Sequence, residues 1–164
     1  MLIPAARVGA LGSPARIALA DRAVALVEGR LAAGKGAAAA WEHTGLATLL
    51  ADILLAEGRL DAAWAVTRAP GLPDHALRRL AEASEAAMPE GALAAYAGLV
   101  ERQVALTNRQ GYEEACRLVA RMAALCARRG EEAEHRAFIE DLLRRYGAKR
   151  SFVALLRNAA RHIP

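Results

Sequence analysis

The sequence predicts an all-α protein, an irregular solenoid or bundle of about eight helices. The chain is 55% hydrophobic but only 4% aromatic, and much of the apolar content is alanine, which favours helices and buries little area. Apolar residues recur at three- and four-residue steps, as on one face of a helix. No run alternates β-branched and polar residues as a strand would. At 164 residues we expect a single helical-hairpin domain, residues 1–164, with an irregular lead-in over residues 1–12.

The first helices are predicted from their caps. Ser13 and Pro14 have the residue types of an N-cap and a first helical position, so a helix should begin there and end before residues 34–36. A second helix is expected over about residues 38–57, closed by Gly58, and Asp61 can cap a third. Their buried faces are expected to be Ile17, Ala20, Val24, Val27 and Leu31, then Trp41, Leu46, Leu49, Leu50, Ile53 and Leu54.

The middle helices are bounded by proline, asparagine and glycine. Pro70, Gly71 and Pro73 break the chain, and a helix should run from Asp74 to Met88. Pro89 opens the next helix, and we expect Asn108 and Gly111 to end it.

The clearest pattern lies in residues 111–146, two amphipathic helices joined by a turn at Gly130. Arg128 and Arg129 end the first of them, where the helix dipole favours cations, and acidic residues 131–134 open the second. A last helix is predicted after a cap at Ser151. One core should contain apolar residues of all three helices, namely Leu118, Met122, Phe138, Leu142 and Leu156.

The cationic residues gather at the C-terminal end. The net charge is +4, and residues 111–164 hold eleven basic and seven acidic side chains against eleven of each in residues 1–110. After Asp141 the charged residues are all basic: Arg144, Arg145, Lys149, Arg150, Arg157 and Arg161. They are candidate contacts to an anionic partner, either nucleic acid or an acidic protein surface. The alternative is a solvated terminal helix. Tyr146 and Phe152 fall on the apolar face rather than beside the arginines, which argues against nucleic acid as the main partner.

The sequence offers no catalytic, cofactor or metal constellation. Glu132 and His135 form one E-x-x-H pair, but a bundle metal site needs a second pair and further glutamates, so we interpret this as an acidic helix start. Gly29, Gly34 and Lys35 match the opening of a phosphate loop, yet Gly36 stands where Ser or Thr is required. Cys116 and Cys126 lie about 15 Å apart along one helix and cannot bridge, so we expect buried thiols in a reducing compartment.

Residues 58–71 pair alanines with Trp64 around a G-R-L-D-A-A turn, as in tetratricopeptide-like hairpins. Residues 55–160 resemble an uncharacterised bacterial helical domain that is similar to the C-terminal helical region of some bacterial SWIM zinc-finger proteins. Tyr112-Glu113-Glu114-Ala115 and the Lys149–Phe152 step carry the resemblance. The cysteine-histidine motif of those zinc fingers is absent. The resemblance implies a tetratricopeptide-like scaffold and no family catalytic residues.

We therefore expect a protein–protein interaction scaffold without catalytic activity or cofactor, with weak non-specific nucleic-acid binding through the C-terminal arginines as the alternative. The longest apolar stretch, residues 46–56, is too short to span a bilayer, so we expect a cytoplasmic protein. The partner is an unidentified protein. A homodimer is left open, because Val8, Leu11, Ile17 and Leu19 suggest a poorly capped N-terminal end.

Overall fold

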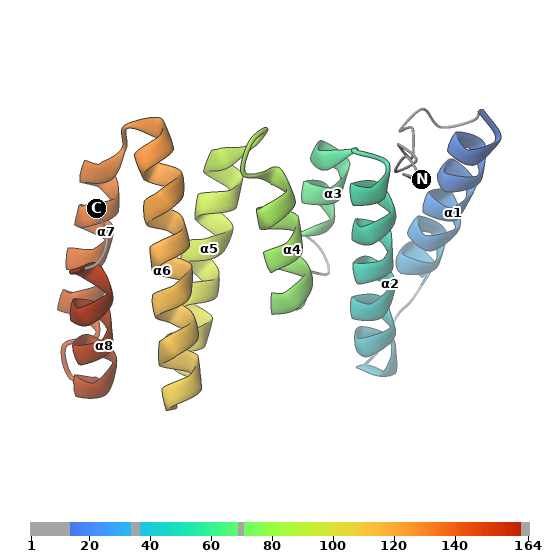
Figure 1. The fold of residues 1–164 in the computed structure, drawn as a ribbon. Coiled ribbons are helices and arrows are strands. Elements are labelled where there is room, and N and C mark those ends of the chain that lie inside the picture. Colours follow the sequence, from blue (N-terminus) through green and yellow to red (C-terminus); the bar gives the residue numbers. More distant parts are fainter. Residues whose placement is uncertain (1–13, 34–36, 69–70, 162–164) are drawn as a thin grey trace, which may run out of the picture. The chain divides into compact units, whose positions relative to one another are not determined.

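The computed structural model describes residues 14–33, 37–68 and 71–161, and these form eight α-helices without a strand (Figure 1). The predicted all-α class is thereby confirmed. The chain divides into two compact units, residues 1–72 and 73–164, each of which is described by itself. The predicted lead-in and Ser13 lie outside the described residues, as do Val8, Leu11 and the side chains of Ile17, Leu19, Leu31 and Trp41.

The first unit contains α1 (Pro14–Ala33), α2 (Ala37–Ala56) and α3 (Leu60–Val66), and α2 packs against both of the others. Its buried apolar side chains among the described residues are small or branched: Val24, Val27, Ala47, Leu50, Ala51, Leu54, Ala63, Val66 and Leu72. Leu49, predicted to be buried, is exposed, because the neighbouring Leu50 and Leu54 take the inward positions. Asp61 does not cap α3; it lies in the first turn, after the N-cap Arg59.

The second unit contains α4 (Asp74–Ser84), α5 (Pro89–Ala105), α6 (Arg109–Arg129), α7 (Glu132–Arg145) and α8 (Arg150–Ala160). In it α5 packs between α4 and α6, and α6 also contacts both α7 and α8. Figure 1 shows these helices side by side. Since α6 touches three neighbours, ten of its residues are buried: Gly111, Tyr112, Ala115, Cys116, Leu118, Val119, Met122, Ala123, Leu125 and Cys126.

The predicted core of this unit is confirmed at Leu118, Met122, Leu142 and Leu156, which are all buried. Phe138, which was predicted to lie in the same core, is only partly buried. The buried stripe of α7 consists of His135, Ile139 and Leu142, at steps of four and three residues. Phe138 lies about 100° from Ile139 around the helix, and therefore at the edge of that stripe. Phe152 fills the interior instead, with its ring 5.5 Å from Tyr112 and 5.9 Å from Tyr146.

Gly130 ends α6 in the left-handed conformation, with φ 72°, as predicted, and Pro89 opens α5. Three other boundaries differ from prediction. The helix that begins at Asp74 ends at Ser84 rather than Met88. Asn108 caps the start of α6 instead of ending α5. The last helix begins at Arg150, one residue before Ser151, and its N-cap Lys149 makes no side-chain capping bond.

Candidate functional site

The most distinctive surface of the second unit is the segment that joins α5 to α6, residues 106–108, which we call the link. Leu106 directly follows α5 and is 57% exposed, and no other large hydrophobic side chain in the described part of the second unit is exposed. The next residue, Thr107, has φ 54°, and among the described residues no other non-glycine has a positive φ. A β-branched residue in this conformation costs roughly 1–2 kcal/mol. Backbone strain of this kind persists where the surroundings hold it, and it is commonest at functional sites.

Hydrogen bonds to the end of α5 and from Lys149 hold the link in place. The amides of Leu106 and Thr107 donate to Gln103 O and Val104 O, both at 3.3 Å, which continues α5 as a tight final turn. Thr107 Oγ1 donates to Ala105 O at 3.1 Å and accepts from Lys149 Nζ at 3.0 Å. The link is therefore tied to the start of α8 as well as to its own helix.

Asn108 and Gly111 explain why α6 begins where it does. The Asn108 side chain accepts a hydrogen bond from Gly111 N at 2.7 Å, which satisfies one free amide of the first turn. A Cβ on Gly111 would lie only 2.5 Å from Gln103 O, so glycine lets the start of α6 approach the end of α5. Sequence reasoning interpreted these two residues as a stop, because asparagine and glycine also end helices.

A cleft of about 520 Å³ lies on one side of the link, and we call it the first cleft. Its apolar lining residues are Leu99 on α5, Leu106 in the link and Leu118 on α6, and of these three Leu106 is exposed whereas the other two are buried. Its polar lining residues come from the N-terminal halves of α4 and α6, from the N-cap of α6 and from the end of α5: Asp74, His75, Arg78, Arg79, Gln103, Asn108, Gln110, Glu114 and Arg117. A second cleft, of about 510 Å³, is lined by Thr107, Asn108, Arg109, Tyr112, Ser151 and Leu155. Residues of the strained link thus line both clefts, Leu106 the first, Thr107 the second and Asn108 both.

The two carboxylates of the first cleft are both engaged by cations. Asp74 accepts hydrogen bonds from Arg102 Nη1 at 2.7 Å and from Gln103 Nε2 at 3.2 Å. Glu114 forms ion pairs through both oxygens, with Arg78 at Oε1 and with Arg117 Nη2 at Oε2, the latter at 2.8 Å. Arg78 also lies 3.5 Å from Glu82, so carboxylates on both α4 and α6 hold the cleft arginines Arg78 and Arg117.

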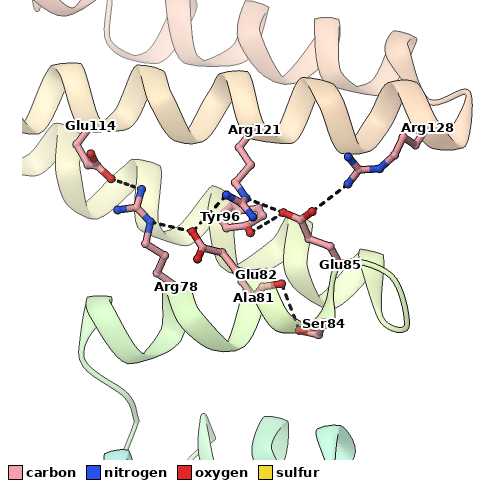
Figure 2. Close-up of polar contacts among 9 residues, drawn as sticks. All are labelled: Arg78, Ala81, Glu82, Ser84, Glu85, Tyr96, Glu114, Arg121 and Arg128. Atoms are coloured by element: carbon pink, nitrogen blue, oxygen red, sulfur yellow. Dashed lines mark hydrogen bonds and ion pairs between the residues drawn. The ribbon is translucent and has the colours of Figure 1, made fainter. Parts of the chain in front are cut away.

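Behind the cleft, a row of charged side chains joins α4 to α6, and we call it the charged ladder. Figure 2 shows it running from Glu114 and Arg78 at one end to Glu85 and Arg128 at the other. Arg78 and Arg121 both lie near Glu82 Oε1, at 3.5 and 3.4 Å. These outer pairs are long and partly exposed, so each contributes little.

Glu85 is the strongest point of the ladder. Its Oε1 accepts hydrogen bonds from Arg121 Nε at 2.6 Å and from the buried Tyr96 hydroxyl at 2.8 Å, and its Oε2 accepts one from Arg128 Nη2 at 2.9 Å. Burial raises the pKa of Glu85, but these three donors outweigh it and hold the pKa below its usual range. Burial and the adjacent carboxylate raise the pKa of Tyr96, which therefore stays a hydrogen-bond donor. The arrangement stabilises the unit and has no feature of a reacting centre.

The six cationic residues singled out in the sequence do not form one surface. Arg144 pairs with Asp141 on its own helix. Arg145 donates to Glu101 at 2.6 Å and to Asp141 at 2.5 Å, and its guanidinium lies 5.4 Å from the Tyr146 ring centre.

The other four belong to α8 or to its two caps, Lys149 and Arg161. Lys149 is engaged by Thr107 and lies 6.0 Å from the ring centre of Tyr112. Arg150, Arg157 and Arg161 are exposed and form no ion pair within the described part of the chain. Because α8 begins at Arg150, these three are spaced by seven and four residues and share one face of the helix. We call them the α8 stripe.

The E-x-x-H pair splits between interior and surface. His135 is buried, and its Nε2 lies 3.0 Å from Val119 O on α6, whereas Glu132 is exposed. Burial lowers the pKa of His135, which favours the neutral ring at that contact. The sequence had been interpreted as placing both Glu132 and His135 at a solvated helix start. This interpretation was wrong for His135, which is buried. Across residues 14–33, 37–68 and 71–161, no group of three or more metal-ligating side chains is found.

Both cysteines are free and buried, as predicted. Burial, with a smaller effect of Glu113, raises the pKa of Cys116 to about 11, which keeps the thiol protonated. No helix in the described part of the chain is long and apolar enough to cross a membrane.

Sequence reasoning missed the link and its clefts because their residues come from four helices, α4, α5, α6 and α8, and because Asn108 and Gly111 were interpreted as a helix stop. Comparisons of the chain with protein-family models, with curated proteins and with solved structures find no match. The resemblance to the helical region of SWIM zinc-finger proteins therefore remains an expectation from the sequence.

Proposed function

We propose that this chain is a protein-interaction scaffold whose second unit docks a segment of a partner protein at the α5–α6 link. The observation that carries the proposal is Leu106, a large apolar side chain that is exposed on a strained but hydrogen-bonded turn and lines the first cleft. An exposed apolar side chain on a rigid support can anchor a partner at a small entropic cost. The polar walls of the clefts resemble the polar rim that surrounds such anchors.

Panning a phage-displayed library of random dodecapeptides on the full chain tests this proposal. Enriched peptides would be synthesised with a fluorescent label, and their affinity measured by anisotropy. We expect Leu106→Ser to weaken binding at least about tenfold, since a buried anchor of this size is worth about 1.5–3 kcal/mol.

The matched control is Leu26→Ser, because Leu26 lies on α1 and is 64% exposed. It should leave the affinity unchanged. Equal losses from the two variants, or no loss from Leu106→Ser, would contradict docking at the link.

A second candidate, weak non-specific binding of nucleic acid, is favoured by the α8 stripe. Arg150 and Arg157 are about 10 Å apart along the axis, and Arg157 and Arg161 about 6 Å, so one strand of phosphates could follow the stripe. With about three phosphate contacts, the log–log salt slope on duplex DNA should be close to −2.7. We expect a dissociation constant no tighter than about 10⁻⁴ to 10⁻⁶ M at physiological salt. Nanomolar affinity in an anisotropy titration would place nucleic acid ahead of the docking proposal.

A further inference from the structure

We propose that the second cleft binds the phosphate group of a small phosphate monoester. This ligand site goes beyond the proposed docking function, because Leu106 lines the first cleft and not the second. Three features carry the proposal: a tyrosine hydroxyl without a partner, a lining of hydrogen-bond donors, and a helix whose free amides begin at the cleft.

Tyr112 is a buried side chain of the second cleft whose hydroxyl has no hydrogen-bond partner. The residue is 6% exposed and lines the cleft. The hydroxyls of Tyr96 and Tyr146 each donate to a glutamate, whereas that of Tyr112 forms no hydrogen bond within the described part of the chain. Polar groups of buried side chains are normally paired, and an exception calls for an explanation. An acceptor atom of a ligand in the cleft provides one.

The Tyr112 hydroxyl is open to the cleft rather than enclosed. Within the described residues, Glu114 Oε1 is the one fully enclosed side-chain oxygen or nitrogen without a hydrogen bond. The Tyr112 hydroxyl is therefore reached from outside, although its ring is held by Phe152, with ring centres 5.5 Å apart. A ligand oxygen in the cleft can thus accept from this hydroxyl without any movement of the ring.

The remaining polar groups of the second cleft are mainly donors, and no carboxylate of the described residues lines it. Asn108 accepts from Gly111 N through its carbonyl oxygen, which leaves the Nδ2 amide as a donor. Ser151 is exposed, and its hydroxyl forms no hydrogen bond within the described chain. Arg109 is balanced by Glu113, to which its Nε donates at 2.7 Å, so it adds donors without adding net charge. Such a lining suits an acceptor-rich anion.

The helix α8 begins at this cleft, and its first residues have the opposite charge from the one that a helix N-terminus favours. The positive end of a helix dipole attracts anions, yet the first turn of α8 contains no acidic residue. Its N-cap Lys149 makes no side-chain capping bond and is followed by Arg150. Lys149 donates to the neutral Thr107 hydroxyl, and neither cation forms an ion pair within the described residues. A bound anion would offset both charges.

Two backbone amides of the first turn of α8 are available to that anion. Val153 N donates to Lys149 O at 3.0 Å, whereas the amides of Ser151 and Phe152 have no acceptor within the described part of the chain. Free amides at the start of a helix are common phosphate ligands, because they point at the anion along the helix dipole. With the Tyr112 hydroxyl they form a set of donors on one side of the cleft.

The charge and the size of the second cleft favour a small phosphate monoester. A phosphate monoester carries close to two negative charges at neutral pH, since its second pKa is about 6, and Lys149 and Arg150 supply two positive charges. The cleft volume of about 510 Å³ lies in the range of small-molecule sites, about 300–1,000 Å³. Leu155 is the one aliphatic side chain in the described lining and is only partly exposed. The ligand should therefore have a small, polar body.

Titration of the full chain, labelled with nitrogen-15 and followed by amide NMR, tests the proposal. The probes are glycerol 3-phosphate and inorganic phosphate at about pH 7.5 and constant ionic strength, where both phosphates are mainly dianions. Glycerol is the uncharged control. The variants are Tyr112→Phe, which removes only the unpaired hydroxyl, and Lys149→Gln. The matched control is Arg157→Gln, an exposed arginine of the same helix that does not line the cleft. Circular dichroism and urea midpoints establish that the variants are folded.

We expect glycerol 3-phosphate to shift the amide signals of Ser151 and Phe152 in a saturable way, and glycerol to leave them unchanged. The dissociation constant should rise about tenfold for Tyr112→Phe and for Lys149→Gln, as for the loss of a hydrogen bond to a charged group. It should change less than about twofold for Arg157→Gln. Glycerol 3-phosphate should bind at least about fivefold more tightly than inorganic phosphate, because its body also contacts the cleft.

Four outcomes would overturn the inference. Without saturation by about 10 mM of either probe, the second cleft is not a phosphate site. Unchanged affinity in Tyr112→Phe means that the hydroxyl does not contact the ligand. Equal losses from Lys149→Gln and Arg157→Gln mean that the overall charge of α8 attracts the anion. Equal or tighter binding of inorganic phosphate assigns the site to free phosphate and rejects the monoester. Each of these outcomes leaves the docking proposal, which Leu106→Ser tests, unaffected.

Discussion

Replacing Glu85 by alanine tests the charged ladder that connects α4 to α5 and α6. The substitution removes the acceptor of three hydrogen bonds, from Arg121, Arg128 and the buried Tyr96 hydroxyl. Glu85 is only 16% exposed, so solvent screens these contacts incompletely. Hydrogen bonds to a charged group contribute about 1.5–3 kcal/mol each when buried, and a stranded buried hydroxyl costs about 1–3 kcal/mol. In the variant, water can solvate Arg121 and Arg128 in place of the lost carboxylate. We therefore expect Glu85→Ala to lower the free energy of unfolding by about 3 kcal/mol.

Glu82→Ala is the matched control, because Glu82 lies in the last turn of α4, which Glu85 caps, and its ion pairs are long, at 3.4 and 3.5 Å, with 37% of its side chain exposed. It should cost less than about 1 kcal/mol. Urea denaturation of the full chain, followed by circular dichroism at 222 nm, gives both values. A loss for Glu85→Ala no larger than that for Glu82→Ala would refute the assignment of Glu85 as the strong point of the ladder.

The contribution of Glu85 to the free energy of unfolding should depend on pH. Because the donors hold the pKa of Glu85 below its ordinary value of 4.5, its contribution is complete above that value. It is lost as the pH falls through the lowered pKa of the folded state, since the unfolded chain takes up the proton first. The stability difference between wild type and Glu85→Ala should therefore shrink in acid.

Other substitutions give further outcomes, each measurable by urea denaturation. Gly130→Ala should destabilise by about 1–2 kcal/mol because its φ of 72° disfavours a Cβ, whereas Gly98→Ala, inside α5 with open space, should stabilise by up to about 1 kcal/mol. Burial lowers the pKa of His135, so stability should be complete above pH 6.5 and fall below it, and His135→Leu should remove that fall. Phe152→Ala should cost about 3–5 kcal/mol, and Phe138→Ala distinctly less because its ring is partly exposed.

Local chemistry is sufficient to predict much of this architecture. Gly130 can adopt a left-handed turn at little cost, Pro89 can begin a helix, and the apolar spacing in α6 marks the face that is buried. These features depend on residues within one or two helical turns, so the sequence reveals them directly. The buried thiols of Cys116 and Cys126 follow from the same spacing.

The functional surface depends instead on which helices meet. Gly111 is required by the approach of Gln103 O from another helix, and no local pattern distinguishes that role from a helix stop. His135 is buried because α6 supplies Val119 O opposite it, and Phe138 is displaced from the core because the stripe beginning at His135 takes the inward face. The sequence by itself determined the helices and most of their buried faces, since these arise from local propensity and periodicity. Only the tertiary structure decided where Leu106 and the cleft arginines come together, because that depends on contacts between residues far apart in the chain.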